Sequence, residues 1–172
     1  MDPHEGEGAK VLQINYSEVL SGVQNYEGIQ LAIAKAIREM KQKGATRVGF
    51  ISGRLGIRKA MREDMEEMRR MSQELSLKHK MPIISSADIF HTVWDDLYET
   101  SLPETERKPK MVTLFDGILE SGVTDIFLME GWDKDGSGEF DSESGSYKEF
   151  LTARKLGINI RDLDPTRPSG QL

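Results

Sequence analysis

The sequence predicts a single-domain α/β protein with a Rossmann-like (flavodoxin-like) parallel sheet of four to five strands and helices on both faces. Apolar runs of strand length alternate with segments that carry apolar residues at helical spacing, and the chain has no internal repeat. Such alternation favours right-handed βαβ units. With 172 residues and 37% hydrophobic content, the chain can bury one core and is short for two domains.

The first predicted helix spans Tyr26–Lys43. Ile29, Ile33 and Ile37 recur at helical spacing, and Gly44 is a suitable stop. The remaining elements follow from the same patterns. They are a strand at 47–52, a helix at about 58–80, a strand at 81–85, an irregular segment at 86–108 with a helical turn near Val93–Tyr98, a helix from Pro109 capped by Gly122, a strand at 124–129, a helix at 146–156 stopped by Gly157, and a strand at 158–163.

The ends of the chain carry weaker patterns. The sequence predicts a disordered tail at residues 1–9 and a loose tail at residues 164–172. The domain then spans residues 10–163. Residues 10–16 fit either a short strand or a packed arm.

Composition excludes several classes of function. The net charge of −6 argues against a nucleic-acid partner, since phosphate binding needs cations. No apolar run approaches the roughly 18 residues of a membrane span, and the N-terminus does not resemble a signal peptide. Without Cys there is no disulfide, thiolate metal site or cysteine nucleophile. We therefore expect a cytoplasmic protein without membrane partners.

Ligands of parallel sheets bind at the carboxyl ends of the strands. Three loops at that edge stand out, which are Ser52–Arg58, the stretch after Ser85, and 130–149. In the first, Gly53 lets the backbone approach a ligand closely, although a tight turn without a ligand explains it equally well.

The third loop leads to a carboxylate near a helix start. Glu149 shares a helix face with Ala153 and Leu156, which places it beside the core. Two interpretations remain open, because Ser146 and Glu149 fit a capping box and Glu149 also fits a positioned reactive group.

Several short motifs follow one another between residues 47 and 162. They are Phe50-Ile51-Ser52-Gly53 at the end of the first strand, Ser86-Ala87-Asp88 after the second, a helical Asp116, Gly131-Trp132 after an apolar strand, and Gly145-Ser146 followed by Glu149 and Ala153. In their order and spacing, these motifs resemble the nucleoside 2-deoxyribosyltransferase superfamily, especially a small uncharacterised branch of it.

The resemblance implies an N-glycosidic chemistry. Glu149 matches the glutamate that attacks the anomeric carbon, as in retaining glycosidases, and a second acid protonates the leaving base. Asp116 matches the residue that contacts the base. Trp132 would wall or stack on the base, although a core tryptophan is equally consistent. The other matching positions imply substrate-binding residues, namely Phe50, Ser52, Gly53, Arg54, Asp88, Gly145 and Ser146.

Two positions depart from the family pattern. Phe50 stands where a tyrosine hydroxyl usually orients the nucleophile, and Glu143 stands where related nucleotide hydrolases have a phosphate-binding serine. The acidic loop around Glu143 should repel phosphate, which favours a nucleoside over a monophosphate, although Arg54 and Arg58 could oppose the repulsion.

The loop 133–144 has a rival interpretation as a cation site. Asp133, Asp135, Ser137 and Asp141 follow the start of a calcium-loop pattern, but Ser144 stands where the bidentate glutamate should be. A third interpretation is a flexible, solvated loop.

The leading hypothesis is therefore cleavage or base exchange at the N-glycosidic bond of a nucleoside-like substrate, without a cofactor. The alternatives are a non-catalytic nucleoside- or nucleotide-binding module and a protein with a cation-binding acidic loop. Because relatives commonly complete the pocket with a neighbouring subunit, the resemblance also implies a homo-oligomer.

Overall fold

The computed structural model of the protein describes residues 12–55, 60–93 and 102–167. Four strands form one parallel sheet in the order β2-β1-β3-β4, and helices flank it on both sides, which confirms the predicted fold class. The strands are β1 (Gly49–Ser52), β2 (Ile83–Ser85), β3 (Asp125–Leu128) and β4 (Asn159–Asp162). The helices are α1 (Tyr16–Val19), α2 (Tyr26–Gln42), α3 (Met61–His79), α4 (Ser86–Val93), α5 (Glu104–Glu120) and α6 (Gly145–Leu156).

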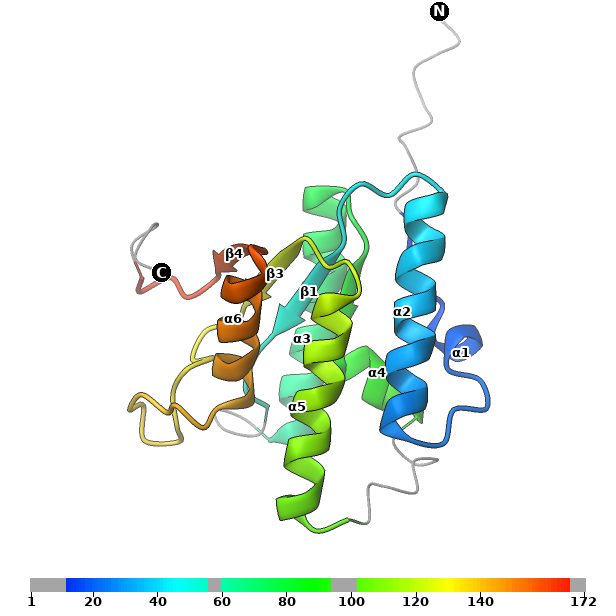
Figure 1. Ribbon diagram of the computed structural model, residues 1–172. Helices are drawn as coiled ribbons and strands as arrows, with labels where there is room; N and C mark the ends of the chain where they lie inside the picture. Colours follow the sequence, from blue (N-terminus) through cyan, green and yellow to red (C-terminus); the bar gives the residue numbers. More distant parts are fainter. Residues whose placement is uncertain (1–11, 56–59, 94–101, 168–172) are drawn as a thin grey trace, which may run out of the picture.

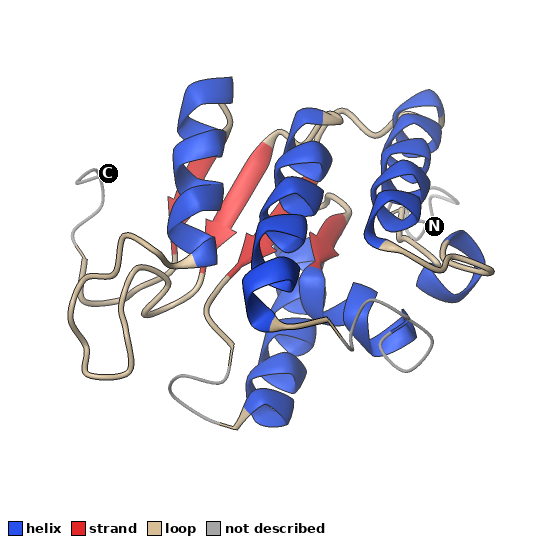
Figure 2. Ribbon diagram, turned by 60° about the horizontal axis from the view of Figure 1, so that its bottom comes forward, coloured by secondary structure: helices blue, strands red, loops and turns tan. Residues whose placement is uncertain are grey.

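Two hydrophobic clusters cover the two faces of the sheet. Helices α2, α5 and α6 stand side by side on one face, and α3 lies behind the sheet (Figures 1 and 2). Phe50 belongs to the cluster under α2, α5 and α6, whereas Ile51 belongs to the cluster under α3. Because side chains alternate along a strand, Ser52 points to the same face as Phe50, toward α5 and α6.

The N-terminal arm closes the outer edge of β2. The Tyr16 hydroxyl accepts a hydrogen bond from the Ser85 backbone N–H at 3.3 Å, and Gln13 Nε2 donates to Ser76 Oγ at 2.9 Å. Residues 12–15 have no regular secondary structure. Of the two interpretations of 10–16, the packed arm is thus the one observed for its described part.

Two predicted boundaries are wrong. Helix α5 begins at Glu104, five residues before Pro109, because the turn that starts at Pro103 is already helical. Proline is tolerated there because it lies in the second turn, where only one backbone hydrogen bond is lost. The segment after β2 is not irregular at its start, since α4 begins directly at Ser86. The helical turn expected near Val93–Tyr98 lies almost entirely outside the described residues.

Of the two predicted tails, only the start of the C-terminal one lies within the described residues. The tail predicted for 1–9 lies outside the described residues, as do 168–172. Residues 164–167 are not loose, because Asp164 is 5% exposed and Arg167 forms ion pairs with Asp133 and Asp162.

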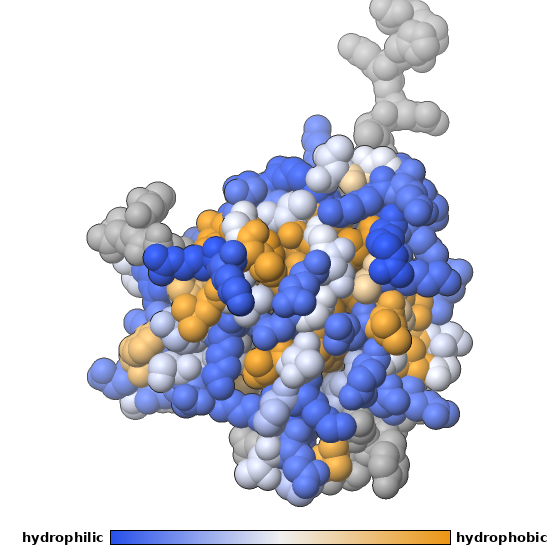
Figure 3. All heavy atoms as spheres, in the orientation of Figure 1, coloured by the Kyte–Doolittle hydropathy of each residue, from blue (hydrophilic) through white to orange (hydrophobic). Residues whose placement is uncertain are grey.

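The surface over α2, α5 and α6 is mostly hydrophilic, with apolar side chains between and beside the helices (Figure 3). Large exposed apolar side chains include Leu31 on α2 and Leu151 and Leu156 on α6. In the part of the chain that the structure describes, no helix has both the length and the apolar character needed to cross a membrane.

Candidate functional site

The centre of the candidate site is a contact between the end of β1 and the second turn of α6. The Ser52 hydroxyl donates a hydrogen bond to Glu149 Oε2, although the two residues are 97 positions apart in the chain. Ser52 is 2% exposed and Glu149 is partly buried. Glu149 therefore points inward to the carboxyl edge of the sheet, where ligands of this fold class bind.

The environment of Glu149 favours its protonated form. Burial raises the pKa of Glu149 to about 8; the Ser52 hydrogen bond opposes this rise, and the nearby Asp116 carboxylate adds to it. A carboxyl group that titrates near neutral pH can act as an acid, a base or a nucleophile, depending on its protonation state.

Asp116 lies on the adjacent helix and forms the second part of the site. Thr152 on α6 donates a hydrogen bond to Asp116 Oδ1 at 2.8 Å. Burial raises the pKa of Asp116; the Thr152 hydrogen bond opposes the rise and the charge of Glu120 supports it. The structure thus brings together Ser52, Glu149 and Asp116 from β1, α6 and α5.

The helix cap at α6 differs from the predicted capping box. Ser144, not Ser146, is the N-cap residue, and its hydroxyl accepts a hydrogen bond from the Tyr147 backbone N–H at 3.4 Å. Glu149 consequently lies in the second turn, beyond the position from which a capping glutamate reaches back. Ser146 is 4% exposed and lies one turn before Glu149, whereas Gly145 is exposed as the first helical residue.

Both aromatic candidates lie in the core. Phe50 is 1% exposed and packs against Phe115, with 5.8 Å between the ring centroids. Trp132 is also 1% exposed and lies against Tyr147 and Phe150. Neither ring lines an open surface, so the indole of Trp132 is not exposed at the site. Phe50 also lacks the hydroxyl that a tyrosine would supply at this position.

The glycine turn after β1 has a packing role. A Cβ atom at Gly53 would lie 2.8 Å from Met129 Sδ and 2.9 Å from Met129 Cβ, so only glycine fits beside β3. Arg54 is also engaged, because its Nη1 donates at 2.6 Å to the Lys134 carbonyl and to Asp141 Oδ2. Arg58 lies outside the described residues.

Asp88 lies in a separate polar cluster. It accepts hydrogen bonds from Arg69 Nε at 3.1 Å and from Ser72 Oγ at 3.4 Å, and both partners belong to α3. Helix α3 covers the opposite face of the sheet from α6 (Figure 1). Asp88 is therefore apart from the Ser52–Glu149 pair.

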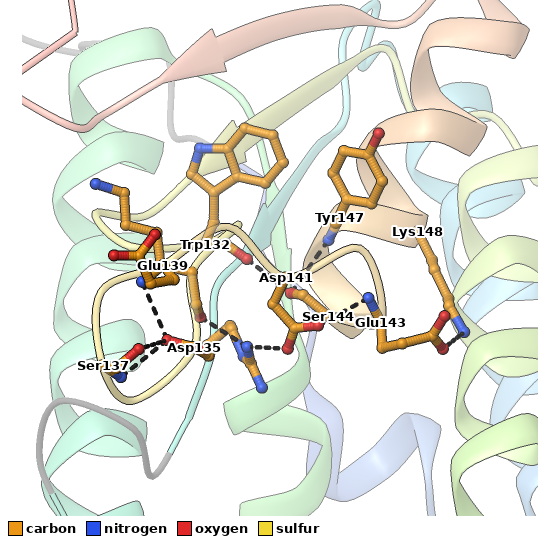
Figure 4. Close-up of polar contacts among 11 residues, drawn as sticks. Trp132, Asp135, Ser137, Glu139, Asp141, Glu143, Ser144, Tyr147 and Lys148 are labelled. Atoms are coloured by element: carbon orange, nitrogen blue, oxygen red, sulfur yellow. Dashed lines mark hydrogen bonds and ion pairs between the residues drawn. The ribbon is translucent and has the colours of Figure 1, made fainter.

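The acidic loop is folded back on itself, and its carboxylates have separate partners (Figure 4). Asp135 accepts hydrogen bonds from the Ser137 hydroxyl and from the backbone N–H groups of Ser137 and Glu139. Asp141 pairs with Arg54, and Glu143 pairs with Lys148. The charges of Asp141 and Glu143 are thus offset by neighbouring cations.

The cation-site interpretation receives no support from this geometry. Within the described ranges, no group of three or more His, Asp or Glu residues could hold a metal ion. The loop also follows strand β3, whereas an EF-hand loop follows a helix.

A cleft of about 650 Å³ lies near the candidate site, between the N-terminal parts of α5 and α6. Its lining includes Val112, which lies one helical turn before Asp116 on α5. The lining also includes Lys148, which is adjacent to Glu149 in the sequence. The cleft is within the size range of small-molecule pockets. Glu149 and Asp116 themselves do not line it.

Comparison with known proteins adds no family assignment. Searches against protein-family models, curated proteins and solved structures found no significant match to the chain.

Sequence reasoning singled out Glu149, Asp116 and Ser52, but it missed Thr152, Asp162 and Arg167. Thr152 carried a usable signal, because it lies one turn after Glu149 on the predicted helix. Asp162 and Arg167 lie near the chain end and carried no such pattern.

Proposed function

We propose that the protein cleaves the N-glycosidic bond of a nucleoside-like small molecule, with Glu149 as the nucleophile. The observation that supports this most directly is the partly buried Glu149 carboxyl group, held by Ser52 at the carboxyl edge of the sheet. A carboxylate in such a position can split one difficult displacement into two easier ones.

The proposed first step needs an ionised nucleophile and a protonated acid. A Glu149 oxygen bonds to the anomeric carbon while the bond to the base breaks, and the base leaves with the bonding electrons. Asp116, whose pKa is raised, donates the proton that the leaving base requires. In the second step, water or another base attacks the anomeric carbon and gives its proton to the Asp116 carboxylate, while the bond to Glu149 breaks and Glu149 leaves as a carboxylate.

The pKa of Glu149 predicts the pH dependence of this reaction. The reaction needs Glu149 ionised and Asp116 protonated at the same time, so kcat/KM of the free enzyme should follow a bell-shaped pH profile with one of its two apparent pKa values near 8.

A panel of 2′-deoxyribonucleosides and ribonucleosides, with free base measured by liquid chromatography, tests the proposal. Glu149→Gln keeps the volume of the side chain and should lose at least about 10³-fold in rate, since the variant cannot attack. Glu139→Gln, on the exposed tip of the acidic loop, is the matched control and should retain full activity. Absence of base release, or release undiminished in Glu149→Gln, contradicts the proposal.

A non-catalytic binding module is the second candidate, and one observation favours it. With a pKa of about 8, Glu149 is mostly protonated at neutral pH and can donate a hydrogen bond rather than attack a sugar. A nucleoside that raises the melting temperature without being consumed indicates this alternative.

A further inference from the structure

The last described residues of the chain form a strap over Trp132. After β4, the backbone N–H of Leu163 still bonds to the Leu128 carbonyl at 2.8 Å, and Asp164 then turns the chain by accepting hydrogen bonds from Thr166 N and Oγ1. This turn brings Arg167 back over the indole, with its guanidinium carbon 5.2 Å from the ring centroid.

Two carboxylates hold the guanidinium group at that place. Arg167 Nη2 donates to Asp133 Oδ1 at 2.6 Å, and Arg167 Nη1 lies 3.3 Å from Asp162 Oδ2. Asp162 Oδ2 also accepts a hydrogen bond from Trp132 Nε1 at 3.3 Å. The carboxylates are largely enclosed, with side-chain exposures of 13% for Asp133 and 9% for Asp162.

The three side chains around Arg167, which are Trp132, Asp133 and Asp162, are held in place by more than the strap. Trp132 and Asp133 belong to the turn after β3, and Trp132 also packs against Phe150 of α6, at 5.0 Å between ring centroids. Asp162 is the last residue of β4 and is in register with Leu128 of β3. The indole and both carboxylates are therefore set by the sheet edge and α6.

A flat aromatic face beside two carboxylates selects a particular cation. A guanidinium group is planar and weakly hydrated, so it can stack on an aromatic ring and donate hydrogen bonds in its own plane. An ammonium group has the same charge but is compact and strongly hydrated, and it has no plane to stack.

We propose that Trp132, Asp133 and Asp162 form a binding site for planar guanidinium-type cations, which Arg167 of the same chain fills. The strap is then a reversible latch, and a small guanidinium compound can take the place of Arg167. This site is distinct from the Ser52–Glu149 pair, and its test does not depend on catalytic activity.

Removal of the internal occupant tests the site. In a Trp94→Phe background, Trp132 is the sole tryptophan, so its fluorescence reports on this position. Arg167→Ala should increase acrylamide quenching of Trp132 and lower Tm by about 3–6 °C. Arg154→Ala, which removes an exposed arginine of α6, is the matched control and should change neither value.

The decisive comparison uses two cations of equal charge. Millimolar methylguanidinium should restore the Tm and the quenching of Arg167→Ala toward the values of the parent protein, whereas methylammonium at the same concentration should not. Adding Asp133→Asn to Arg167→Ala should abolish the restoration, because the carboxylate that forms the shorter ion pair in the parent protein is then absent.

Other outcomes overturn the proposal. Equal restoration by both cations shows simple charge screening, and no restoration shows that Arg167 is only a structural cover. If Arg167→Ala does not fold, Arg167→Lys carries the same test, since it keeps the charge but loses the planar donors.

Discussion

The two ends of the sheet each enclose a carboxyl group, but they treat it in opposite ways. At the amino end, Asp125 of β3 is 0% exposed and accepts hydrogen bonds from Arg47 at 2.7 and 3.3 Å and from Arg161 at 3.3 Å. At the carboxyl end, the Glu149 carboxyl group accepts a hydrogen bond from the Ser52 hydroxyl, and the described charge that acts on its pKa is another carboxylate, Asp116.

The pKa shifts follow from these partners. Burial alone would raise the pKa of Asp125, but hydrogen bonds from Arg47 and Thr124 and the charge of Arg47 hold it below its usual range. For Glu149 no cation among the described residues offsets burial, and its pKa is raised to about 8. Asp125 therefore has the surroundings of a structural ion pair, whereas Glu149 has those of a group available for proton transfer.

The largest expected effect comes from removing the charge at the amino end. Asp125→Asn should lower the free energy of unfolding by about 3 kcal/mol at pH 7, because two arginines lose their buried partner. Urea denaturation measures this change. Glu39→Gln, in an exposed pair with Lys35, should change stability by less than about 0.5 kcal/mol. Equal losses in the two variants contradict a structural role for Asp125.

At the carboxyl end of the sheet, removal of the carboxyl group should increase stability at alkaline pH rather than lower it. Since the pKa of Glu149 is about 8 in the folded protein and 4.5 as a free group, the contribution of Glu149 to stability is most favourable at low pH and declines as pH rises through this interval. Glu149→Gln removes this decline. It should match the parent protein near pH 4 and be more stable than the parent protein at pH 9.

Denaturation at several pH values measures the difference, with Glu139→Gln as control. If the difference in stability between Glu149→Gln and the parent protein does not grow in favour of the variant from pH 4 to pH 9, the raised pKa of Glu149 is contradicted. The Asp125 contribution has the reverse sign, because a lowered pKa stabilises the fold at neutral pH and is lost as pH falls into the acid range.

A smaller effect should follow from the loss of the Ser52 hydroxyl. The hydrogen bond from Ser52 favours the ionised form of Glu149, so Ser52→Ala should raise the pKa of Glu149 further, by less than about one unit. Carboxyl-carbon NMR titration measures it. A pKa that falls in Ser52→Ala contradicts the assigned direction of this hydrogen bond.

The smallest expected effect concerns the neighbouring carboxyl group. Thr152→Val removes the hydrogen bond that opposes the raised pKa of Asp116, so this pKa should rise further while the packing between α5 and α6 is kept. The same titration measures it. Ser121→Ala, which removes a hydroxyl bonded to the Gly117 carbonyl, is the control and should leave the Asp116 pKa unchanged.

The sequence by itself determined the class of fold and the position of one key residue. Apolar periodicity is a local property, so the helix from Tyr26 and the strands around Phe50 and Ile126 could be predicted. The left-handed conformation of Gly157, with φ of 72°, likewise agrees with its predicted role at the end of α6. Glu149 was placed beside the core because helical spacing fixes which residues share a face.

Only the tertiary structure decided which side chains meet. Ser52 and Glu149 are 97 positions apart, Arg47 and Asp125 are 78 apart, and Asp133 and Arg167 are 34 apart, and no local pattern links the members of these pairs. Strand order and the choice of sheet face set such contacts, and these depend on how the whole chain packs. Ionisation follows the contacts rather than the residue type, which is why a pKa could not be predicted for either Asp125 or Glu149 before the fold was known.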